Sequence, residues 1–429
     1  MHKTKIAVTG LGVVSPLGND VPSTWDALLT GKSGIAPIQQ FDASHFPARI
    51  AAEVKNFVPT YPSLGKNQRY TMPFTQYALQ AAHEALTDAK IASTPENAHR
   101  FGVVSGSGMM TTSFEYLHRF QEACAVDGEV DWTRLQAVDS DFCVISDFGK
   151  TISNTVLSLL IQAYQLYGYA TSVHTACASS GQAIGLAMQV IRRGEADVML
   201  AGGFDSMITP LGLSSFCLLG ALSTYNETPT TASRPFDKTR NGFVLGEGAA
   251  FLVLESWEHA QARGARIYAE LAGEGNSLSS YRITDSHPDG DGAIQAIQRA
   301  LHDAGIKPEA VDYINAHGTS TFMNDLSETN AIKAVFGKQV PVSSTKGQTG
   351  HLIAAAGALE AVISVLSMHH GCIPPTANYT NPDPDCDLDY VSEGPRKQIL
   401  KNVLSNSFGF GGSNSCLVFQ HHPSQEGEL

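Results

Sequence analysis

The sequence Val173-His174-Thr175-Ala176-Cys177-Ala178-Ser179-Ser180-Gly181-Gln182-Ala183-Ile184 decides how the rest of the chain is interpreted. A short apolar run ends at Cys177, and small residues then lead into a helical pattern in which Ile184, Met188 and Ile191 share one face. Cys177 is therefore predicted at a turn from a strand to a helix. Unpaired N–H groups and the helix dipole favour a thiolate there, and the same N–H groups can hydrogen-bond a developing oxyanion. This is a nucleophile's position, although a buried structural cysteine explains the stretch alone equally well.

The composition is that of a globular protein. The chain has 429 residues, of which 43% are hydrophobic, enough for one large domain or two of ordinary size. Its formal net charge of −13 argues against a broad basic surface for nucleic acid or anionic lipid. With charged residues at only 16%, much surface is expected to be buried by tight packing or by a partner subunit.

The cysteines and the apolar runs indicate where the protein works. The seven cysteines form no C-x-x-C pair, so neither a zinc site nor a disulfide framework is predicted, and a reducing cytoplasm fits best. The first apolar run, Ile6-Ala7-Val8, is too short for a signal peptide. No run approaches the 18 uninterrupted apolar residues of a membrane span, so none is expected.

One order of sequence patterns occurs twice along the chain. Ala85-Leu86-Thr87-Asp88-Ala89 before the strand pattern at 101–108 is echoed by Ala300-Leu301-His302-Asp303-Ala304 before the strand pattern at 312–317. The Gly-rich segment and apolar strand at 242–254 are echoed at 407–419. We therefore predict two pseudo-repeated halves, residues 1–265 with the cysteine and residues 266–429, and a site shared between them. Alternating strand and helix patterns predict an α/β fold with mostly parallel central sheets covered by layers of helices.

Individual strands and helices are predicted from the periodicity of apolar residues and from the positions of glycine and proline. Residues 5–14 and 101–108 are expected to form strands, and residues 23–29 and 73–89 helices.

Two histidines in the second half end strand patterns. His317 lies in Asn315-Ala316-His317-Gly318-Thr319-Ser320-Thr321, and His351 ends the run Ser343-Ser344-Thr345-Lys346-Gly347-Gln348-Thr349-Gly350-His351. A lone histidine is more often structural, but two on glycine-bordered strand ends, together with Cys177, predict one pocket. A cysteine can accept an acyl group from a thioester, and two histidines can then stabilise the carbanion of a second substrate. That combination predicts a Claisen condensation.

Four motifs then resemble one family. They are Thr175-Ala176-Cys177-Ala178-Ser179-Ser180, Ala316-His317-Gly318-Thr319-Ser320-Thr321, Lys346-Gly347-Gln348-Thr349-Gly350-His351 and Asn406-Ser407-Phe408-Gly409-Phe410-Gly411-Gly412-Ser413-Asn414. In this order and spacing they resemble the elongating, type II β-ketoacyl-acyl-carrier-protein synthases of the thiolase fold. The likeness spans the chain from Val8-Thr9-Gly10-Leu11-Gly12 onward.

The resemblance implies a role for each matching catalytic residue. Cys177 would carry the acyl chain, His317 and His351 would hold the malonyl thioester carbonyl during decarboxylation, and Lys346 would polarise the site. The backbone N–H groups of Cys177 and Phe408 would form the oxyanion hole, and the Phe408 ring would be the gate for the acyl chain. The chain would then grow by two carbons in fatty acid or type II polyketide synthesis, with no metal or redox cofactor and with substrates on the phosphopantetheine of an acyl carrier protein.

The resemblance also implies supporting residues. Thr319 and Thr321 would bind the phosphopantetheine arm, and Met109 would lie on the floor of the acyl pocket. Asp325, Glu328 and Glu360 would form a charged network behind Lys346, although simple structural ion pairs explain them equally well. Lys66 and Arg69 match part of a carrier-protein docking surface, with ordinary solvated charge as the alternative.

The chain departs from this family just before the nucleophile. Where fatty acid synthases usually carry a Pro-Phe-Phe-Val-Pro-like segment that reaches into the partner's acyl pocket, this chain has Phe142-Cys143-Val144-Ile145-Ser146-Asp147-Phe148-Gly149. The usual Gly-Pro becomes Gly168-Tyr169, and His174 replaces an apolar or small residue and is interpreted as structural. These changes leave open a homodimer or a heterodimer with a homologous chain-length-factor subunit, and a polyketide or polyene pathway.

Two other functions remain as alternatives. A thiolase using coenzyme A would place a second catalytic cysteine near the C-terminal glycine run, where Cys416 instead lies inside a strand pattern. A non-catalytic chain-length subunit would have the same fold, but such relatives usually lack the nucleophile that Cys177 supplies.

Overall fold

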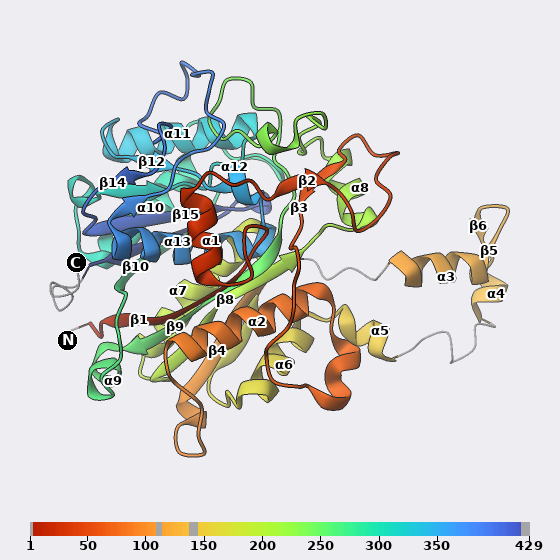
Figure 1. Ribbon diagram of the computed structural model, residues 1–429, viewed down its shortest axis with the longest axis horizontal. Coiled ribbons are helices and arrows are strands. Elements are labelled where there is room, and N and C mark those ends of the chain that lie inside the picture. Colours follow the sequence, from red (N-terminus) through yellow and green to blue (C-terminus); the bar gives the residue numbers. More distant parts are fainter. Residues whose placement is uncertain (1–2, 109–113, 137–144, 422–429) are drawn as a thin grey trace.

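The fold is built around one large mixed β-sheet (Figure 1). The structure is a computed structural model that describes residues 3–108, 114–136 and 145–421, so Met109 and residues 142–144 of the departing segment lie outside the described residues. Ten strands lie in the order β12-β11-β15-β16-β10-β1-β9-β8-β4-β7. Their bounds are β1 Ile6–Val14, β4 Phe101–Ser107, β7 Ala170–Val173, β8 Val198–Ser206, β9 Glu247–Ser256, β10 Ala269–Leu278, β11 Tyr313–Asn315, β12 Val342–Ser343, β15 Asn402–Phe408 and β16 Ser413–Gln420.

The order of strands is the same on both sides of the sheet centre. From the edge inward, the first five strands lie as β7-β4-β8-β9-β1 and the last five as β12-β11-β15-β16-β10. If the five strands of each set are numbered by their order along the chain, both sets lie in the order third, second, fourth, fifth, first. The two sets join through the antiparallel pairing of β1 with β10. Between the sets, helix α9 ends at Ala262 and β10 begins at Ala269.

The sheet is mixed, which corrects the prediction of mostly parallel sheets. β4 is parallel to β7 and β8, and β11 is parallel to β12 and β15, whereas the pairings among β8, β9, β1, β10, β16 and β15 are antiparallel. The physical reason is clearest at β15 and β16, which a short turn at 409–412 joins into a hairpin, and a hairpin can pair only antiparallel strands. The α/β class itself is confirmed.

Helices cover both faces of the sheet. The central helices α7 and α13 contact each other and pack on one face, while α2 and α6 cover the other face in the first half and α10 and α11 in the second (Figure 1). The bounds of the helices are α1 Val21–Leu29, α2 Pro73–Asp88, α3 Phe114–Cys124, α4 Trp132–Gln136, α5 Ile145–Lys150, α6 Ser153–Tyr164, α7 Ser179–Arg192, α8 Pro210–Leu218, α9 Trp257–Ala262, α10 Asp291–Ala304, α11 Phe322–Phe336, α12 Lys346–Thr349 and α13 Ala356–His370. The predicted strands at 5–14 and 101–108 and helices at 23–29 and 73–89 are confirmed to within two residues.

Small residues let one helix of each half lie directly on a strand. A Cβ added at Gly10 of β1 would fall on the carbonyl oxygen of Ala85 in α2, and one added at Gly273 of β10 would fall on that of Ala300 in α10. The echoed stretches at 85–89 and 300–304 therefore have the same packing role in the two halves. Each presents alanines to a glycine-bearing strand, so that backbone packs against backbone.

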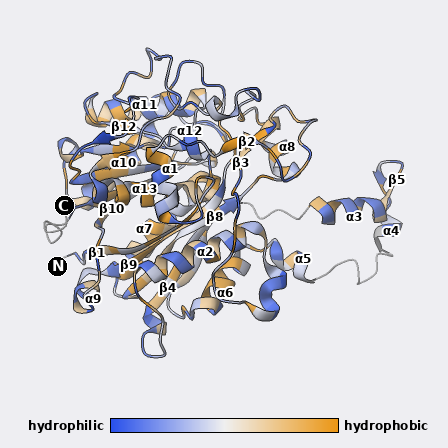
Figure 2. Cartoon of the chain, in the orientation of Figure 1, coloured by the Kyte–Doolittle hydropathy of each residue, from blue (hydrophilic) through white to orange (hydrophobic). Residues whose placement is uncertain are grey.

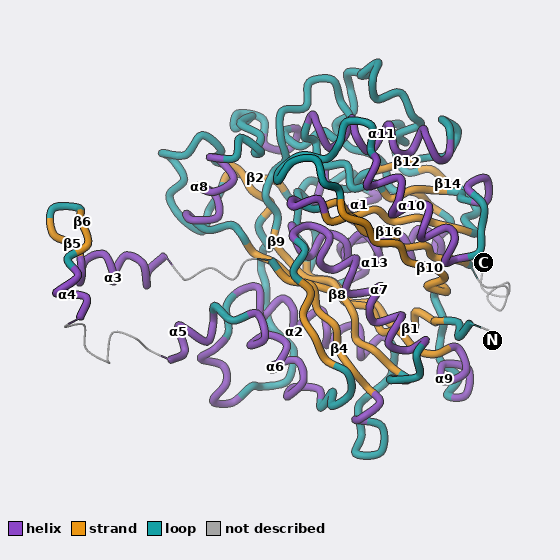
Figure 3. Tube along the Cα trace, turned by 180° about the vertical axis from the view of Figure 1, so that it is seen from behind, coloured by secondary structure: helices purple, strands orange, loops and turns teal. Residues whose placement is uncertain are grey.

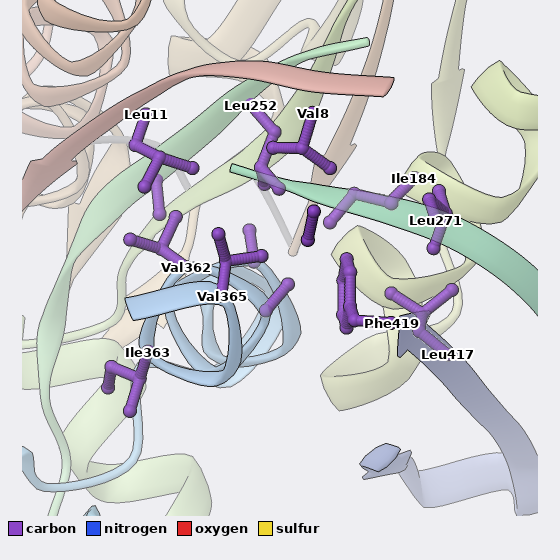
Figure 4. Close-up of a cluster of buried hydrophobic side chains, with 14 of the residues drawn as sticks. Val8, Leu11, Ile184, Leu252, Leu271, Val362, Ile363, Val365, Leu417 and Phe419 are labelled. Carbon is purple, nitrogen blue, oxygen red and sulfur yellow. The ribbon is translucent and has the colours of Figure 1, made fainter. Parts of the chain in front are cut away.

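The largest hydrophobic cluster lies between the sheet and the two central helices (Figure 4). Side chains from β1, β9, β10 and β16 meet those from α7 and α13, and the labelled residues are Val8, Leu11, Ile184, Leu252, Leu271, Val362, Ile363, Val365, Leu417 and Phe419. Each buried branched side chain of this kind contributes about 1.5–3 kcal/mol of transfer free energy. This shared core fixes the start of α7 relative to the start of α13.

The helical run Ile353–His370 is long and apolar enough to cross a membrane by length and composition. In this fold, however, 89% of that run is buried inside the protein, and it forms the central helix α13. It is therefore explained as a core helix.

A small extension stands away from the body of the molecule (Figures 1 and 3). It contains α3, α4 and the short antiparallel pair β5 Ala125–Val126 and β6 Glu129–Val130. Exposed apolar side chains lie on it, among them Phe114 at 53% and Trp132 at 70% exposure. Two further short strand pairs, β2 Ile35–Pro37 with β3 Ile50–Ala52 and β13 Cys372–Ile373 with β14 Arg396–Lys397, lie outside the main sheet.

Candidate active site

Cys177 lies at the turn between β7 and the central helix α7, as its sequence predicts. It is the middle residue of a 3₁₀ turn, Ala176–Ala178, that runs directly into α7. Ala176 has a φ of 49°, a left-handed conformation that is uncommon for a residue with a side chain. The Ser179 hydroxyl braces the turn by donating to the Ala176 carbonyl (2.6 Å) and accepting from the Thr175 N–H (2.9 Å). The sulfur is thus held by a strained and well-braced backbone.

The Cys177 side chain is a buried thiol. The residue is 5% exposed, and burial raises its pKa to about 12. The nearby Lys346 ammonium and a hydrogen bond from the Phe410 N–H lower the pKa, while Asp205 and Glu360 raise it. Burial therefore opposes the thiolate that the start of the helix favours. The thiol must give up its proton when it reacts.

His317 follows β11 on a turn that a carboxylate holds. Glu328 of α11 accepts from the N–H groups of His317 (2.8 Å) and Gly318 (2.7 Å), and also from the side-chain amide of Asn406 (3.1 Å). Gly318 has a φ of 34° and lies against Ser344. Because Glu328 fixes two successive N–H groups, the imidazole of His317 is aimed from a rigid loop.

His351 is held by the loop that precedes β9. Its N–H donates to the carbonyl of Val244 (2.7 Å), and its own carbonyl accepts from the N–H of Gly246 (2.9 Å). The ring meets that of Phe243 edge-on, with centroids 5.2 Å apart. The motif at 346–351 is therefore fixed by backbone pairing with the first of the two echoed Gly-rich segments.

The three reactive side chains converge. The Sγ of Cys177 and one ring nitrogen each of His317 and His351 all lie within 4.8 Å of one another, and all three residues are buried. The two imidazole rings are T-shaped, with centroids 5.2 Å apart. Burial first, and then the Lys346 ammonium, lower the pKa of both histidines well below the usual value. Both are therefore neutral at physiological pH and available as N–H donors. One thiol and two imidazoles are also a donor set that a thiophilic divalent cation such as Zn²⁺ could occupy.

Lys346 is a buried cation paired with a buried carboxylate. Its ammonium donates to Glu360 of α13, to the carbonyl of His317 (2.6 Å) and towards His317 Nδ1 (3.4 Å). Burial raises the pKa of Glu360 to about 7, against the opposing effect of Lys346. Lys346 therefore touches both a histidine loop and a central helix, and it adds positive charge where an enolate or a thiolate would form.

A narrow pocket leads from these groups to the surface. Its volume is about 50 Å³, and Cys177, His317 and His351 line it together with Thr319 and Thr321. An outer pocket of about 280 Å³ continues from it and shares Thr321 and Phe410 as lining residues. The Thr319 and Thr321 hydroxyls are 2.9 Å apart in the passage. This shape suits a long, thin substrate arm that delivers a reactive end to a buried thiol.

Comparison with known proteins assigns this arrangement to a family. The model of the β-ketoacyl synthase N-terminal domain matches residues 3–260, and that of the C-terminal domain matches residues 268–380. The chain belongs to the β-ketoacyl synthase family. This ketosynthase is 45% identical over 423 residues to the 3-oxoacyl-[acyl-carrier-protein] synthase 2 of Coxiella burnetii, covering 97% of this chain and 99% of the relative. It is 43% identical over 424 residues to the protein of the same name from Vibrio harveyi, covering 98% and 99%.

Solved structures agree with this assignment. A β-ketoacyl synthase from Burkholderia phymatum STM815 superposes with a TM-score of 0.87 at 34% identity, over 98% of this chain and 100% of that chain. A type II polyketide synthase ketosynthase, solved in complex with its acyl-carrier protein, gives 0.87 at 35% identity over the same shares. The predicted family, the thiolase-like α/β fold and the acyltransferase class of ketosynthases are therefore confirmed.

In the glycine-rich segment 406–414 of this ketosynthase, the phenylalanine whose N–H acts on the Cys177 sulfur is Phe410, whereas the sequence predicted Phe408. The backbone N–H that hydrogen-bonds Cys177 belongs to Phe410, not to Phe408. Phe408 ends β15, is 6% exposed and packs its ring edge-on against His317 at 5.8 Å. The Phe410 ring lines both pockets and lies 6.5 Å from that of Phe216. Phe410 thus lies between the sulfur and the outer pocket. In the sequence it is the second phenylalanine of Phe408-Gly409-Phe410, and that position could have indicated it.

The three acidic residues predicted behind Lys346 divide between two tasks. Glu360 pairs with Lys346, as expected. Glu328 instead holds the His317 turn, and Asp325 accepts from the N–H groups of Ser320 (3.2 Å) and Phe236 (2.7 Å). Asp325 and Glu328 therefore fix the histidine-bearing loop. Asp205, close enough to raise the pKa of Cys177, was not singled out in the sequence; its signal is a carboxylate at the end of an otherwise apolar, glycine-rich strand.

Lys66, Arg69 and His174 line neither of these two pockets. Lys66 and Arg69 are exposed on the short turn Gly65–Tyr70, where the Arg69 guanidinium stacks over Tyr70. His174 is exposed and its Nδ1 lies 3.2 Å from the Ser107 hydroxyl, in agreement with a structural role.

Proposed function

We propose that this ketosynthase elongates acyl chains on an acyl carrier protein in fatty acid synthesis, by decarboxylative condensation at Cys177. The observation that carries the proposal is the approach of one buried thiol and two neutral imidazoles within 4.8 Å. The curated relatives at 40–45% identity over nearly the whole chain carry the name 3-oxoacyl-[acyl-carrier-protein] synthase 2, which supports this pathway.

In the first step the acyl group moves to the enzyme. The Cys177 sulfur attacks the carbonyl of the acyl thioester, and its proton passes through an imidazole to the departing phosphopantetheine thiolate. The N–H groups of Cys177 and Phe410 stabilise the oxyanion. Since the thiol is protonated at rest, a neutral imidazole within reach is needed as the proton acceptor.

In the second step the malonyl group loses CO₂. The N–H donors of His317 and His351 hydrogen-bond the thioester carbonyl as the bond to the carboxylate breaks and an enolate forms. The Lys346 ammonium adds positive charge beside them. Neutral imidazoles suit this step because they stabilise the enolate oxygen without protonating the carbon.

In the third step the enolate carbon attacks the acyl-Cys177 carbonyl. The carbon–sulfur bond breaks, Cys177 leaves as a thiolate and recovers a proton, and the product on the carrier is a 3-oxoacyl chain two carbons longer. The passage lined by Thr319 and Thr321 would hold the phosphopantetheine arm, and the Phe410 ring, beside the sulfur, would be the gate in place of Phe408. Met109 remains a candidate for the acyl-pocket floor, and Lys66 and Arg69 for carrier docking.

The two halves would share this work. We propose a division at residues 265 and 266, with the first half holding the acyl chain on Cys177 and the second half supplying both histidines and Lys346. The repeated strand order supports the division. Work in the cytoplasm, with no bound cofactor and with both acyl groups delivered by the carrier protein, completes the proposal.

A dimer is proposed from the edge of the sheet. β7 is the last strand of the sheet, so its outer edge pairs with no other strand among the described residues, and the extension projects beyond α5 (Figures 1 and 3). Figure 2 shows apolar residues on the extension, and Phe148 of α5 and Tyr167 before β7 are 71% and 54% exposed. A second copy that continued the sheet beyond β7 would cover these side chains. A heterodimer with a homologous subunit would cover the same surface.

A polyketide ketosynthase is the second candidate. The type II polyketide synthase ketosynthase shares the fold at 35% identity, and the ishigamide ketosynthase/chain length factor shares it at 33%. These identities are lower than the 45% shared with the fatty acid enzyme of Coxiella burnetii, so the fatty acid pathway is favoured.

Intact-protein mass spectrometry after incubation with a panel of acyl carrier proteins tests the proposal. We expect saturated acyl groups to load one site per chain, mapped to Cys177, and added malonyl carrier protein to discharge it as a product two carbons longer. Loading by polyketo or polyunsaturated chains alone, with a homologous subunit copurifying, would establish the second candidate. No loading at Cys177 by any chain would refute both.

A further inference from the structure

The two threonines that line the narrow pocket stand on either side of a strained residue, Ser320. Ser320 is fully buried and has a φ of 72°, a left-handed conformation that is uncommon for a residue with a side chain. Its N–H donates to Asp325 (3.2 Å), its carbonyl accepts from the Gly242 N–H (3.0 Å), and its hydroxyl accepts from the Arg234 N–H (2.9 Å). Strain of this kind persists only where neighbouring groups hold the backbone in place. The turn at 319–321 is therefore held from its buried side.

A buried arginine supports the two residues that follow this turn. The Arg240 guanidinium donates to the carbonyls of Thr321 and Phe322, at 3.3 Å in each case. It also lies over the Phe322 ring, 5.0 Å from its centre. Thr321 lines both pockets and Phe322 lines the outer one, whereas Arg240 itself lines neither. One guanidinium thus contacts two successive residues of the passage wall from behind.

Two carboxylates hold this guanidinium. Asp383 lies 2.6 Å from Nη1 of Arg240 and Asp325 lies 3.8 Å from Nε, and the Arg240 side chain is fully buried. Thr321 and Phe322 form the N-terminal end of α11, where the helix dipole disfavours a cation. Burial of a charge costs further free energy unless the charge is paired. Helix stability therefore does not explain an arginine at this place, whereas its planar fork of fixed donors suits the holding of two carbonyl groups.

We propose that Arg240 is a positioning residue for the substrate arm, because it fixes the carbonyls of Thr321 and Phe322 and so aligns the wall of the passage to Cys177. This inference rests on the proposed function, in which Thr319 and Thr321 bind the phosphopantetheine arm. Arg240 touches neither the substrate nor the reacting atoms. Its loss should therefore weaken the binding of both carrier substrates and leave the thiol and the histidines in place.

Arg240→Lys tests the proposal. A lysine keeps the positive charge beside Asp325 and Asp383, but its compact ammonium group lacks the fork that holds two carbonyl groups at once. Steady-state kinetics with acyl and malonyl carrier proteins give KM and kcat separately. Alkylation of Cys177 by iodoacetamide, followed on its own peptide by mass spectrometry, reports the surroundings of the sulfur without the arm. Hydrogen exchange of the peptide that contains Ser320 reports the turn without any substrate.

Arg192→Lys is the matched control. The Arg192 side chain is also buried, at 8% exposure, pairs with Asp303 at 2.8 Å and donates to the carbonyl of Ala272 at 2.7 Å. Arg192 lines neither pocket. Asp383→Asn is a milder variant, because it leaves Arg240 in place and removes only the charge of the carboxylate nearest to it.

We expect Arg240→Lys to raise KM for both carrier substrates about tenfold and to change kcat by less than about threefold, as expected for a loss of binding shared by ground state and transition state. Hydrogen exchange around Ser320 should be faster, and alkylation of Cys177 should match the wild type. Asp383→Asn should raise both KM values about threefold. Arg192→Lys should match the wild type in every assay.

Three outcomes with Arg240→Lys would overturn the inference: wild-type KM values, a loss confined to kcat, or alkylation of Cys177 that changes as much as KM does. If Arg240→Lys does not fold, unchanged KM values in Asp383→Asn would overturn it instead. If no carrier protein loads Cys177 of the wild type, the proposed function fails and the role in binding the arm fails with it. Faster exchange around Ser320 in Arg240→Lys would then still support the hold of Arg240 on the turn, and unchanged exchange would refute that as well.

Discussion

The two halves of the molecule build the same helix start and use it differently. In the first half the 3₁₀ turn Ala176–Ala178 places Cys177 at its middle position, and in the second half Ile353–Ala355 places Ala354 there. The N–H of Phe410, from the second half, hydrogen-bonds the sulfur of Cys177, while Asp205, from the first half, accepts from the N–H of Ala354. One helix start is thus left open to a substrate oxygen, and the other is filled by the protein's own carboxylate. The two helix starts therefore have similar backbone geometry, and the side chains around them give them different roles.

The largest effect should follow from removing the thiol from the open helix start. Cys177→Ala should lower the rate of condensation by at least about 10³-fold, because no other group can carry the acyl chain. Cys416→Ala, in the second half's strand β16, is the matched control and should keep most of the activity. The measurement is formation of 3-oxoacyl product from acyl and malonyl carriers. Loss of activity in the Cys416 variant alone would point to a thiolase-like mechanism instead.

Lys346 links the second half's histidine loop to its central helix, and its removal should cost both stability and rate. Lys346→Met leaves Glu360 buried without its cation, which should lower the free energy of unfolding by about 3–5 kcal/mol. Urea unfolding measures this, with Lys333→Met of α11 as the control, because its ion pair with Asp387 is partly open to solvent; we expect it within about 1 kcal/mol of the wild type. A Lys346→Met protein as stable as the control would show that the buried pair is not needed for folding.

The glycines under α2 and α10 test whether the halves are equivalent in packing. Gly10→Ala and Gly273→Ala should each lower the free energy of unfolding by about 1–3 kcal/mol, because each methyl group meets a helix carbonyl oxygen. Gly194→Ala, with open space around it and a φ of 74°, is the control and should cost about 1 kcal/mol from its backbone conformation alone. A large cost at only one of the two sites would show that the halves pack differently. The measurement is again urea unfolding.

Part of the fold and of the candidate site could be predicted from the sequence. Cys177, His317 and His351 could be predicted because small residues and glycines at strand ends are visible as patterns. The echo of 85–89 at 300–304 marks two places where a helix packs on a glycine-bearing strand. The choice between Phe408 and Phe410 could not be made from the pattern, because it depends on where β15 stops and on the positive φ values of Gly411 and Gly412. Asp205 and the antiparallel pairing of β1 with β10 depend on long-range packing, which leaves no local signal.

A smaller effect should appear in the pH dependence of stability. Burial raises the pKa of Glu84, in the first half, and of Glu328, in the second, to about 7, above the usual value of about 4.5. The folded state then binds these protons more tightly than the unfolded state, so this contribution to stability is full below about pH 4.5 and is lost as the pH rises to about 7. Glu84→Gln and Glu328→Gln should each flatten the slope of unfolding free energy between pH 4.5 and 7. A slope identical to the wild type in both variants would contradict these pKa shifts.

The division of labour between the halves is tested most directly by CO₂ release from malonyl carrier protein, measured in parallel on Cys177→Ala and His317→Ala. We expect Cys177→Ala still to release CO₂ although it cannot condense, because the histidines and Lys346 of the second half remain in place. We expect His317→Ala still to be acylated at Cys177 but to release CO₂ at least about 10²-fold more slowly than Cys177→Ala. If Cys177→Ala releases no CO₂, or if His317→Ala releases it at the wild-type rate, the two halves do not divide the reaction in this way.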